Sequence, residues 1–151
     1  MKECNIKEDP VRPELDNTFR RSYGRKIFGV KYKREIHAVM CFAYTNEIPK
    51  SVEELDIMSQ DAHLQSTLRG QNVGKIAIAY TVWSKKKGGG KLIVKEVFNK
   101  IKKSNHLNRL VTLSPLTDMA YKFHIKNGAK LISVNETTQN FEYKVIKNKK
   151  Y

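Results

Sequence analysis

The sequence has few of the residues that build disulfide-linked or metal-linked scaffolds. Among 151 residues it holds two cysteines, Cys4 and Cys41, which lie far apart and outside any Cys-x-x-Cys pair. A disulfide framework or a structural zinc site needs more cysteines at closer spacing. The four histidines show no metal-ligand spacing with one another or with the cysteines. The sequence therefore predicts a protein without a metal cofactor.

Long apolar runs are also lacking. No segment approaches the roughly 20 apolar residues needed to span a bilayer, and the first residues, MKECNIKEDPVRPELD, are charged where a signal peptide would be apolar. We therefore expect a cytoplasmic protein with no membrane partner. A chain of 151 residues with 40% apolar residues is typical of one compact domain. We divide it into an extended lead-in over residues 1–23, with room for one short helix, and a domain over 24–151.

Acidic residues are scarce relative to basic ones. The chain has 15 Asp and Glu against 29 Lys and Arg, which gives a net charge of +14. Such an excess indicates a polyanionic partner. Nucleic acid is the less favoured candidate, because the lysines are spread along the chain without a helix-turn-helix, zinc-finger or aromatic-rich RNA-binding signature, and the basic run Lys144–Lys150 is typical of a solvated tail. A phosphorylated small molecule satisfies the same electrostatics.

Hydrophobic patterning predicts the first half of a mixed fold. β-branched and aromatic residues recur in Arg25–Tyr32 and Ile36–Tyr44 around a polar break, which is typical of a strand pair. Ser51 and Glu54 then have the capping-box spacing that starts a helix. We expect this helix to follow the strand pair directly.

A strand, a helix and a second strand come next. Lys75–Trp83 is an apolar strand, Lys91–Lys103 has apolar residues at helical spacing, and Arg109–Leu113 is a short apolar run that stops before Pro115. A right-handed crossover of this kind joins parallel strands, whose carboxyl ends lie at one edge of the sheet. Ser114 should therefore share that edge with the turn after the first strand.

The C-terminal third completes the predicted fold. Thr117 or Asp118 can cap a further helix, which Gly128 ends in a left-handed conformation. Two strands, at 131–134 and 140–146, follow around a polar turn. Together these elements predict an α/β (α+β) fold in a single domain, with a mixed central β-sheet flanked by helices.

The turn between the strand Lys75–Trp83 and the following helix is rich in lysine and glycine. Glycines allow backbone conformations that aim successive N–H groups at one point, and the free amides of the helix add a partial positive charge there. Such a turn can hold a phosphate, although the same residue types also suit an ordinary solvated loop. The residues expected to bind the anion are Lys85, Lys86, Lys87, Gly88, Gly89, Gly90 and Lys91.

This turn loosely resembles the Q/R-x-x-G-x-G/A signature of the GNAT acetyltransferases. Lys85, Gly88 and Gly90 stand at its defined positions, with lysine replacing the usual glutamine or arginine. The segment Ala120–Gly128 is similar to the family's A-x-x-L-Y-x-x-x-G-F segment, and His124 stands where those enzymes usually carry a tyrosine acid. The resemblance implies a GNAT-like fold with the pyrophosphate of coenzyme A on the turn.

A closer resemblance is to the catalytic domain of malonyl-CoA decarboxylase, itself a GNAT-fold enzyme. The family's S/T-L-S-P motif matches Thr112–Pro115, its F-H-L-x-N-G-A motif matches Phe123–Ala129, and its closing N-Y-x-Y is similar to Asn140–Tyr143. The match runs in broken segments between Arg25 and Tyr143. The family's long insertion between the first two motifs is much shorter here.

The resemblance implies conversion of malonyl-CoA to acetyl-CoA and carbon dioxide, with a coenzyme A thioester as substrate and no metal. The family's catalytic serine and histidine correspond to Ser114 and His124, and we expect Thr112, Asn135 and Asn140 to bind substrate. A serine hydroxyl can donate to a departing carboxylate or a developing oxyanion. An imidazole that titrates near neutrality can deliver a proton to the α-carbon.

Two other functions are compatible with the sequence. Transfer of an acetyl group from acetyl-CoA to an amine needs a general base, often a glutamate on the strand before the glycine turn, but Lys75–Trp83 contains no carboxylate. A non-catalytic module that binds acyl-CoA or nucleic acid would also account for the charge. Without the family match, Ser114 could be a turn residue bonded to its own backbone, and His124 a satisfied buried histidine.

Overall fold

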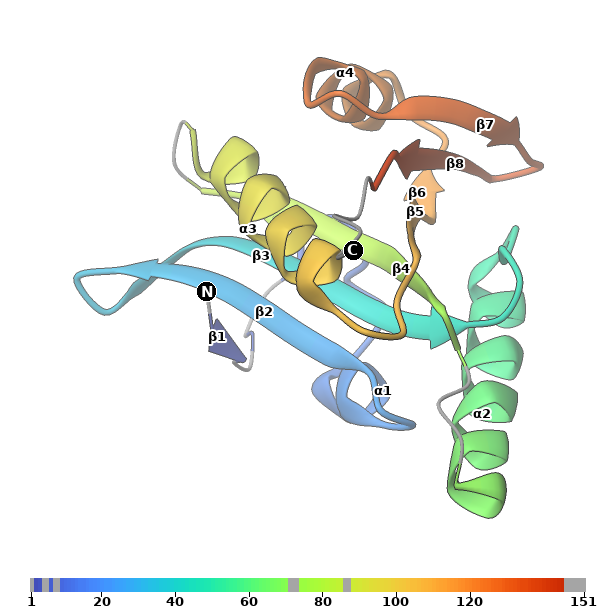
Figure 1. The fold of residues 1–151 in the computed structure, drawn as a ribbon. Coiled ribbons are helices and arrows are strands. Elements are labelled where there is room, and N and C mark those ends of the chain that lie inside the picture. Colours follow the sequence, from blue (N-terminus) through green and yellow to red (C-terminus); the bar gives the residue numbers. More distant parts are fainter. Residues whose placement is uncertain (1, 4–5, 7–8, 71–73, 86–87, 146–151) are drawn as a thin grey trace, which may run out of the picture.

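The computed structural model describes residues 2–3, 6, 9–70, 74–85 and 88–145, which form one sheet with helices on both sides (Figure 1). In chain order, the described elements are β1 (Lys2–Glu3), α1 (Asn17–Arg21), β2 (Lys26–Tyr32), β3 (Glu35–Thr45), α2 (Val52–Arg69), β4 (Ile76–Ser84), α3 (Gly89–Lys103), β5 (Arg109–Thr112), β6 (Ser114–Pro115), α4 (Asp118–Lys126), β7 (Lys130–Val134) and β8 (Thr138–Tyr143).

The sheet is mixed, as the sequence predicts. Its strand order is β1-β2-β3-β4-β5-β8-β6, and β7 pairs with β8. Only β4 and β5 run parallel among the described strands, and the other pairs are antiparallel. The helix α3 connects the parallel pair and lies across one face of the sheet (Figure 1). The predicted strand–helix–strand crossover is therefore confirmed.

The local signals in the sequence set most element boundaries. The strand pair β2 and β3 turns at Lys33 and Arg34, whose φ angles of 49° and 70° are left-handed. The Ser51 hydroxyl accepts the Glu54 backbone N–H at 3.1 Å, which confirms the expected cap of α2. Strands expected at 131–134 and 140–146 are found one or two residues earlier at their starts, and Ile146 lies outside the described residues.

The last helix also begins and ends where its cap residues predict. The Thr117 hydroxyl accepts the Ala120 backbone N–H at 3.2 Å at the start of α4. Gly128, just beyond the helix, has a φ of 95°, which is the left-handed conformation expected at a helix end.

Apolar residues from alternate strand positions fill both faces of the sheet. Along β4, Ala77 and Ala79 face α3, whereas Ile76, Ile78 and Tyr80 face the opposite side. The α3 face also receives residues from α4, β7 and β8, and the other face is covered by α2 and by Ile6, Leu15 and Phe19 of the lead-in. A sheet buried on both faces explains why β4 reads as a nearly continuous apolar run.

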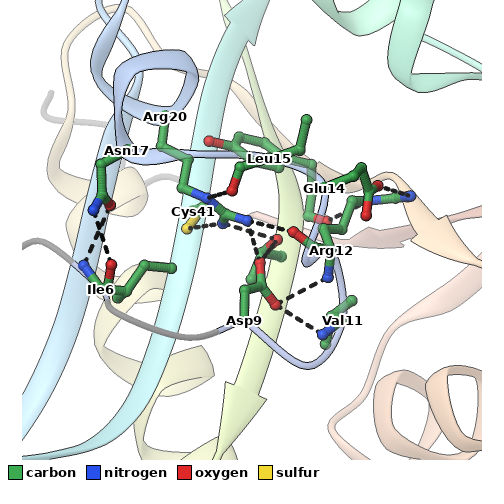
Figure 2. A network of polar contacts seen from close by, with 11 residues as sticks. Ile6, Asp9, Val11, Arg12, Glu14, Leu15, Asn17, Arg20 and Cys41 are labelled. Atoms are coloured by element: carbon green, nitrogen blue, oxygen red, sulfur yellow. Dashed lines mark hydrogen bonds and ion pairs between the residues drawn. The ribbon is translucent and has the colours of Figure 1, made fainter.

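The lead-in contributes buried charged residues to the second face (Figure 2). Arg20 is 1% exposed and forms an ion pair with the buried Asp9, with 2.5 Å between Nη2 and Oδ2. The same Asp9 oxygen accepts the Thr81 hydroxyl of β4 at 2.9 Å, and Arg20 Nη1 donates to Cys41 Sγ at 3.2 Å. In addition, β1 pairs with β2 and α1 packs on this face. The described lead-in residues that make these contacts are thus part of the core rather than only a connection to it.

Removal of the Arg20 charge should strongly destabilise the fold. Arg20→Met leaves the Asp9 carboxylate buried without its ion-pair partner, and breaking such a pair costs about 3–5 kcal/mol. We expect the free energy of unfolding, measured by urea titration, to fall by about that amount. As a control, Lys26→Met removes only the exposed pair with Glu3 and should leave the urea midpoint nearly unchanged. Equal shifts in the two variants would contradict the structural role of Asp9 and Arg20.

Candidate functional site

The parallel strands β4 and β5 separate near their carboxyl ends. Their last pair joins Ala79 to Thr112, and the Leu113 N–H donates to the Ala79 carbonyl at 2.8 Å. Beyond this point β4 continues to Ser84, paired with β3 alone, whereas the chain after β5 pairs with β8 through β6. We call the place where the two strands separate, after Ala79 and Leu113, the splay.

The N-terminus of α3 lies just beyond β4 and has free backbone donors. Its N-cap, Gly88, has a φ of 85°, a left-handed conformation that glycine adopts readily. No side chain caps this end, and the Leu92 N–H makes the first helical hydrogen bond to the Gly88 carbonyl at 3.1 Å. The N–H groups of the first turn and the helix dipole therefore favour an anion at this position.

The next two glycines are required for close packing. A Cβ atom at Gly89 would lie 2.5 Å from Ser84 Oγ, and one at Gly90 would lie 2.5 Å from Phe123 Cε2. The two glycines let α3 approach the end of β4 on one side and α4 on the other. For this reason α3 begins at Gly89, so the prediction that it starts at Lys91 is wrong.

Two of the candidate lysines, Lys85 and Lys91, are described and flank this helix end in the sequence. Lys85 and Lys91 are exposed, and the Lys85 Nζ lies 5.8 Å from the centroid of the Trp83 ring. Lys86 and Lys87 lie outside the described residues. The positive charge of the described lysines adds to the partial charge of the helix end. Anion binding by the lysine and glycine turn stays a prediction.

Ser114 is buried in β6, directly after the splay. Its Oγ lies 2.8 Å from Oγ1 of Thr112, and that Thr112 oxygen accepts the Phe141 N–H at 3.1 Å. Thr112 therefore fixes the position of the Ser114 hydroxyl relative to β8. Because β4 and β5 are parallel, Ser114 and the turn after β4 follow strand ends at the same edge of the sheet.

His124 is a buried histidine of α4, with 3% of its surface exposed. Its ring stacks on Phe141 with centroids 5.0 Å apart, and its Nδ1 lies 2.6 Å from the Tyr143 hydroxyl. Burial lowers the pKa of the imidazole to about 4, and burial also raises the pKa of the Tyr143 phenol. The ring is neutral at pH 7. The prediction of an imidazole that titrates near neutrality is therefore wrong, because desolvation disfavours the charged ring.

Ser114 and His124 are connected through Phe141. The Phe141 ring stacks on His124, and its backbone N–H binds the Thr112 hydroxyl that contacts Ser114. Within the part of the chain that the structure describes, no hydrogen bond joins Ser114 to His124. A substrate would have to lie between the two side chains to use both, and their catalytic roles stay a prediction.

The two candidate asparagines hold the end of the sheet together. The Asn140 Nδ2 donates to the carbonyls of Pro49 at 3.0 Å and Thr112 at 2.9 Å, and its Oδ1 accepts from the Asn135 Nδ2 at 2.8 Å. The Asn135 Nδ2 also donates to Thr138 Oγ1 at 2.8 Å. These contacts give both asparagines structural partners. Substrate binding by Thr112, Asn135 and Asn140 stays a prediction.

Arg12 is a residue of the splay that sequence reasoning missed. Its Nε donates to the Tyr80 carbonyl at 3.1 Å, and its Nη2 donates to the Leu113 carbonyl at 3.2 Å. These carbonyls belong to the residues that follow the last contacts between β4 and β5, so the guanidinium bridges the two strands where they separate. No local pattern could reveal this role, because the partners are 68 and 101 positions away along the chain.

A cavity of about 310 Å³ lies at the opposite end of α3, away from the splay. Its lining is mostly apolar and includes Lys100, Lys103 and His106, but none of the predicted site residues. Across the described ranges, no cluster of His, Cys, Asp or Glu is suited to hold a metal ion. None of the helices in those ranges is both long and apolar enough to cross a bilayer.

Solved structures with the same arrangement of elements identify the fold, although no family model and no curated protein matches the sequence. The GNAT-like decarboxylase GphF, in complex with isobutyryl-CoA, is similar at a TM-score of 0.62 and 8% identity, over 80% of this chain and 78% of that chain. For the loading GNATL domain of CurA from Lyngbya majuscula, the TM-score is 0.58 at 10% identity, over 79% and 76%. The chain has the GNAT fold.

A third GNAT-fold structure is that of an acetyltransferase. The N-acetyltransferase PseH from Campylobacter jejuni, in complex with acetyl coenzyme A, is similar at a TM-score of 0.53 and 15% identity, over 84% of this chain and 72% of that chain. The predicted GNAT-like mixed sheet flanked by helices is thus confirmed. In this chain's version of the GNAT fold, the start of α3 contacts α4 where Gly90 lies against the Phe123 ring.

The lowered pKa of His124 predicts a pH-dependent stability. Above its ordinary pKa of 6.5, the imidazole is neutral in both the folded and the unfolded chain, and its contribution is complete. As the pH falls from about 6.5 to about 4, the unfolded chain binds the proton more readily, and about 3 kcal/mol of stability is lost. Urea unfolding at pH 7 and pH 4.5 measures this loss. It should be much smaller in His124→Gln, and an equal loss in both proteins would contradict the buried neutral ring.

Proposed function

We propose that the chain binds a coenzyme A thioester, with the diphosphate at the N-terminus of α3 and the thioester in the splay beside Ser114. The observation that carries this proposal is the uncapped start of α3, whose free N–H groups follow the carboxyl end of β4, at the edge of the sheet toward which β4 and β5 diverge. The exposed Lys85 and Lys91 add charge that suits phosphate groups. Two proteins of the same fold, GphF and PseH, are in complex with isobutyryl-CoA and acetyl coenzyme A.

We further propose a decarboxylation of the malonyl-CoA type. The bond between the α-carbon and the carboxylate breaks, carbon dioxide leaves, and the electron pair delocalises into the thioester as an enolate. The α-carbon then takes up a proton, which gives acetyl-CoA. Support comes from the S/T-L-S-P and F-H-L-x-N-G-A motifs, which bring Ser114 and His124 to two sides of Phe141, and from the decarboxylase GphF of the same fold.

In this proposal Ser114 and His124 each act as a hydrogen-bond donor. The Ser114 hydroxyl, held by Thr112, can donate to the departing carboxylate or to the enolate oxygen. A hydrogen bond from the Tyr143 hydroxyl to Nδ1 of His124 would place the ring's proton on Nε2, where the neutral ring can also donate to the enolate oxygen. Because the pKa of His124 is about 4, the proton for the α-carbon comes from water in this proposal.

Acetyl transfer to an amine is the second candidate function, since PseH has the same fold. The strand β4 carries no carboxylate that could act as its general base. If coenzyme A thiol appeared from acetyl-CoA only in the presence of polyamines or peptides, transfer would be favoured over decarboxylation. A non-catalytic module is the third candidate. Strong, salt-dependent binding of duplex DNA without any stabilisation by coenzyme A would favour its nucleic-acid form.

Coenzyme A binding can be tested at the start of α3. Coenzyme A should raise the midpoint of thermal unfolding, because it binds only the folded chain. In Lys91→Glu we expect at least about fivefold weaker binding, since an attraction to phosphate becomes a repulsion. Lys95→Glu makes the same charge change about one turn further along α3 and should weaken binding much less. Equal affinities for both variants would contradict a diphosphate at this helix end.

Release of carbon dioxide from malonyl-CoA tests the proposed reaction. Ser114→Ala and His124→Gln should each lower the rate at least about 100-fold, since each removes a donor to the enolate. His63→Gln, at an exposed histidine of α2, is the matched control and should keep the wild-type rate. Undiminished release in a folded Ser114→Ala or His124→Gln protein would contradict the proposed role of that residue.

A further inference from the structure

Two buried arginines, Arg12 and Arg20, lie near one buried carboxylate on the face of the sheet opposite α3, but only the Arg20 guanidinium binds it (Figure 2). Asp9 is engaged by Arg20 through its Oδ2, and its Oδ1 accepts the backbone N–H groups of Val11 and Arg12. The Arg12 side chain has one ion pair in the described part of the chain, a long one of 4.0 Å to Glu14, and Glu14 is 58% exposed. The charge of Arg12 is therefore poorly compensated, although the residue is buried.

Arg12 also has hydrogen-bond donors to spare. A guanidinium carries five N–H groups, and the carbonyls of Tyr80 and Leu113 bind one on Nε and one on Nη2. Both N–H groups on Nη1, and the second on Nη2, have no acceptor within hydrogen-bonding distance among the described residues. Burial lowers the pKa of the guanidinium, which reflects the cost of holding this charge away from water. An anion at Nη1 would offset that cost.

These N–H groups of Arg12 lie next to the proposed acyl site. The Leu113 carbonyl that it holds belongs to the peptide bond that precedes Ser114. The Tyr80 carbonyl lies on β4, on the other side of the splay. A thioester that entered the splay beside Ser114 would therefore point its acyl end toward the guanidinium.

We propose that Arg12 makes the splay selective for acyl groups that end in a carboxylate. This inference rests on the proposed function, because it assumes that a coenzyme A thioester occupies the splay. The guanidinium binds the terminal carboxylate through Nη1 while it continues to hold the two strand carbonyls. The same positive charge repels the ammonium group of an amine acceptor, so it favours decarboxylation over acetyl transfer. Arg12 is thus a specificity residue that the N-terminal lead-in supplies to a site built from the centre of the chain.

Binding affinities of wild type and Arg12→Gln test the proposal, because glutamine can still donate to a carbonyl but carries no charge. Isothermal titration with coenzyme A, acetyl-CoA, malonyl-CoA and the methyl ester of malonyl-CoA supplies the affinities. Wild type should bind malonyl-CoA at least about tenfold more tightly than its neutral ester, as expected for a charge-assisted hydrogen bond. In Arg12→Gln this preference should fall to nearly one, with the affinity for coenzyme A unchanged within about twofold. Arg69→Gln, at an exposed arginine of α2, should keep the full preference.

The same measurements separate the possible failures. If wild type binds none of the four coenzyme A compounds, the proposed function fails and this inference fails with it. If all four bind equally well, or if a folded Arg12→Gln protein keeps the preference for the acid, only the selectivity of Arg12 is overturned. If Arg12→Gln does not fold, the preference of Glu14→Gln for malonyl-CoA over its neutral ester tests the role of Arg12 instead. Loss of this competing, exposed carboxylate should raise the preference for malonyl-CoA, and an unchanged preference would overturn the role of Arg12.

Discussion

The separation of β4 from β5 leaves backbone groups that the surrounding residues must satisfy. Parallel strands that stop pairing inside a protein leave backbone carbonyls without ladder partners, and such groups cost free energy unless a donor reaches them. Arg12 provides donors to the carbonyls of Tyr80 and Leu113, one from each side. The same separation places Ser114 and the free start of α3 at one edge of the sheet. The residue that satisfies these carbonyls therefore lies next to Ser114, the residue proposed to act in catalysis.

Burial on both faces of the sheet determines how the polar residues near the splay behave. On one face, His124 packs against Phe141 and loses the water that would stabilise its charged form, so it is neutral at pH 7. On the other face, Arg20 keeps its charge beside Asp9. The proposed site thus combines the neutral ring of His124 on one side of the sheet with the guanidinium of Arg12, which Asp9 does not pair, on the other. This distribution suits a reaction in which negative charge moves from a carboxylate to a thioester oxygen.

The sequence predicted the secondary-structure elements and caps that depend on residues close together in the chain. Alternation and helical spacing located the strand pair, the parallel crossover and α4, and the caps at Ser51, Thr117 and Gly128 were confirmed. The start of α3 was missed because Gly89 and Gly90 serve close packing as well as backbone freedom, which depends on Ser84 and Phe123 rather than on neighbours in sequence. The titration of His124 was missed because a residue's degree of burial is a tertiary property. The ion pair of Asp9 with Arg20 and the contacts of Arg12 were missed because charges near a terminus usually indicate a solvated segment.

The placement of the lead-in has a consequence for synthesis. Arg12 leaves the ribosome long before the two carbonyls it binds, since these lie 68 and 101 positions later in the chain. Its buried partners in the sheet are then missing, and the early segment has no hydrophobic surface to cover. Contacts between distant parts of a chain close slowly, because the entropy of a long loop is lost before they form. The segment around Arg12 is therefore made before the strands that it binds but reaches its final position only after most of the sheet has been assembled.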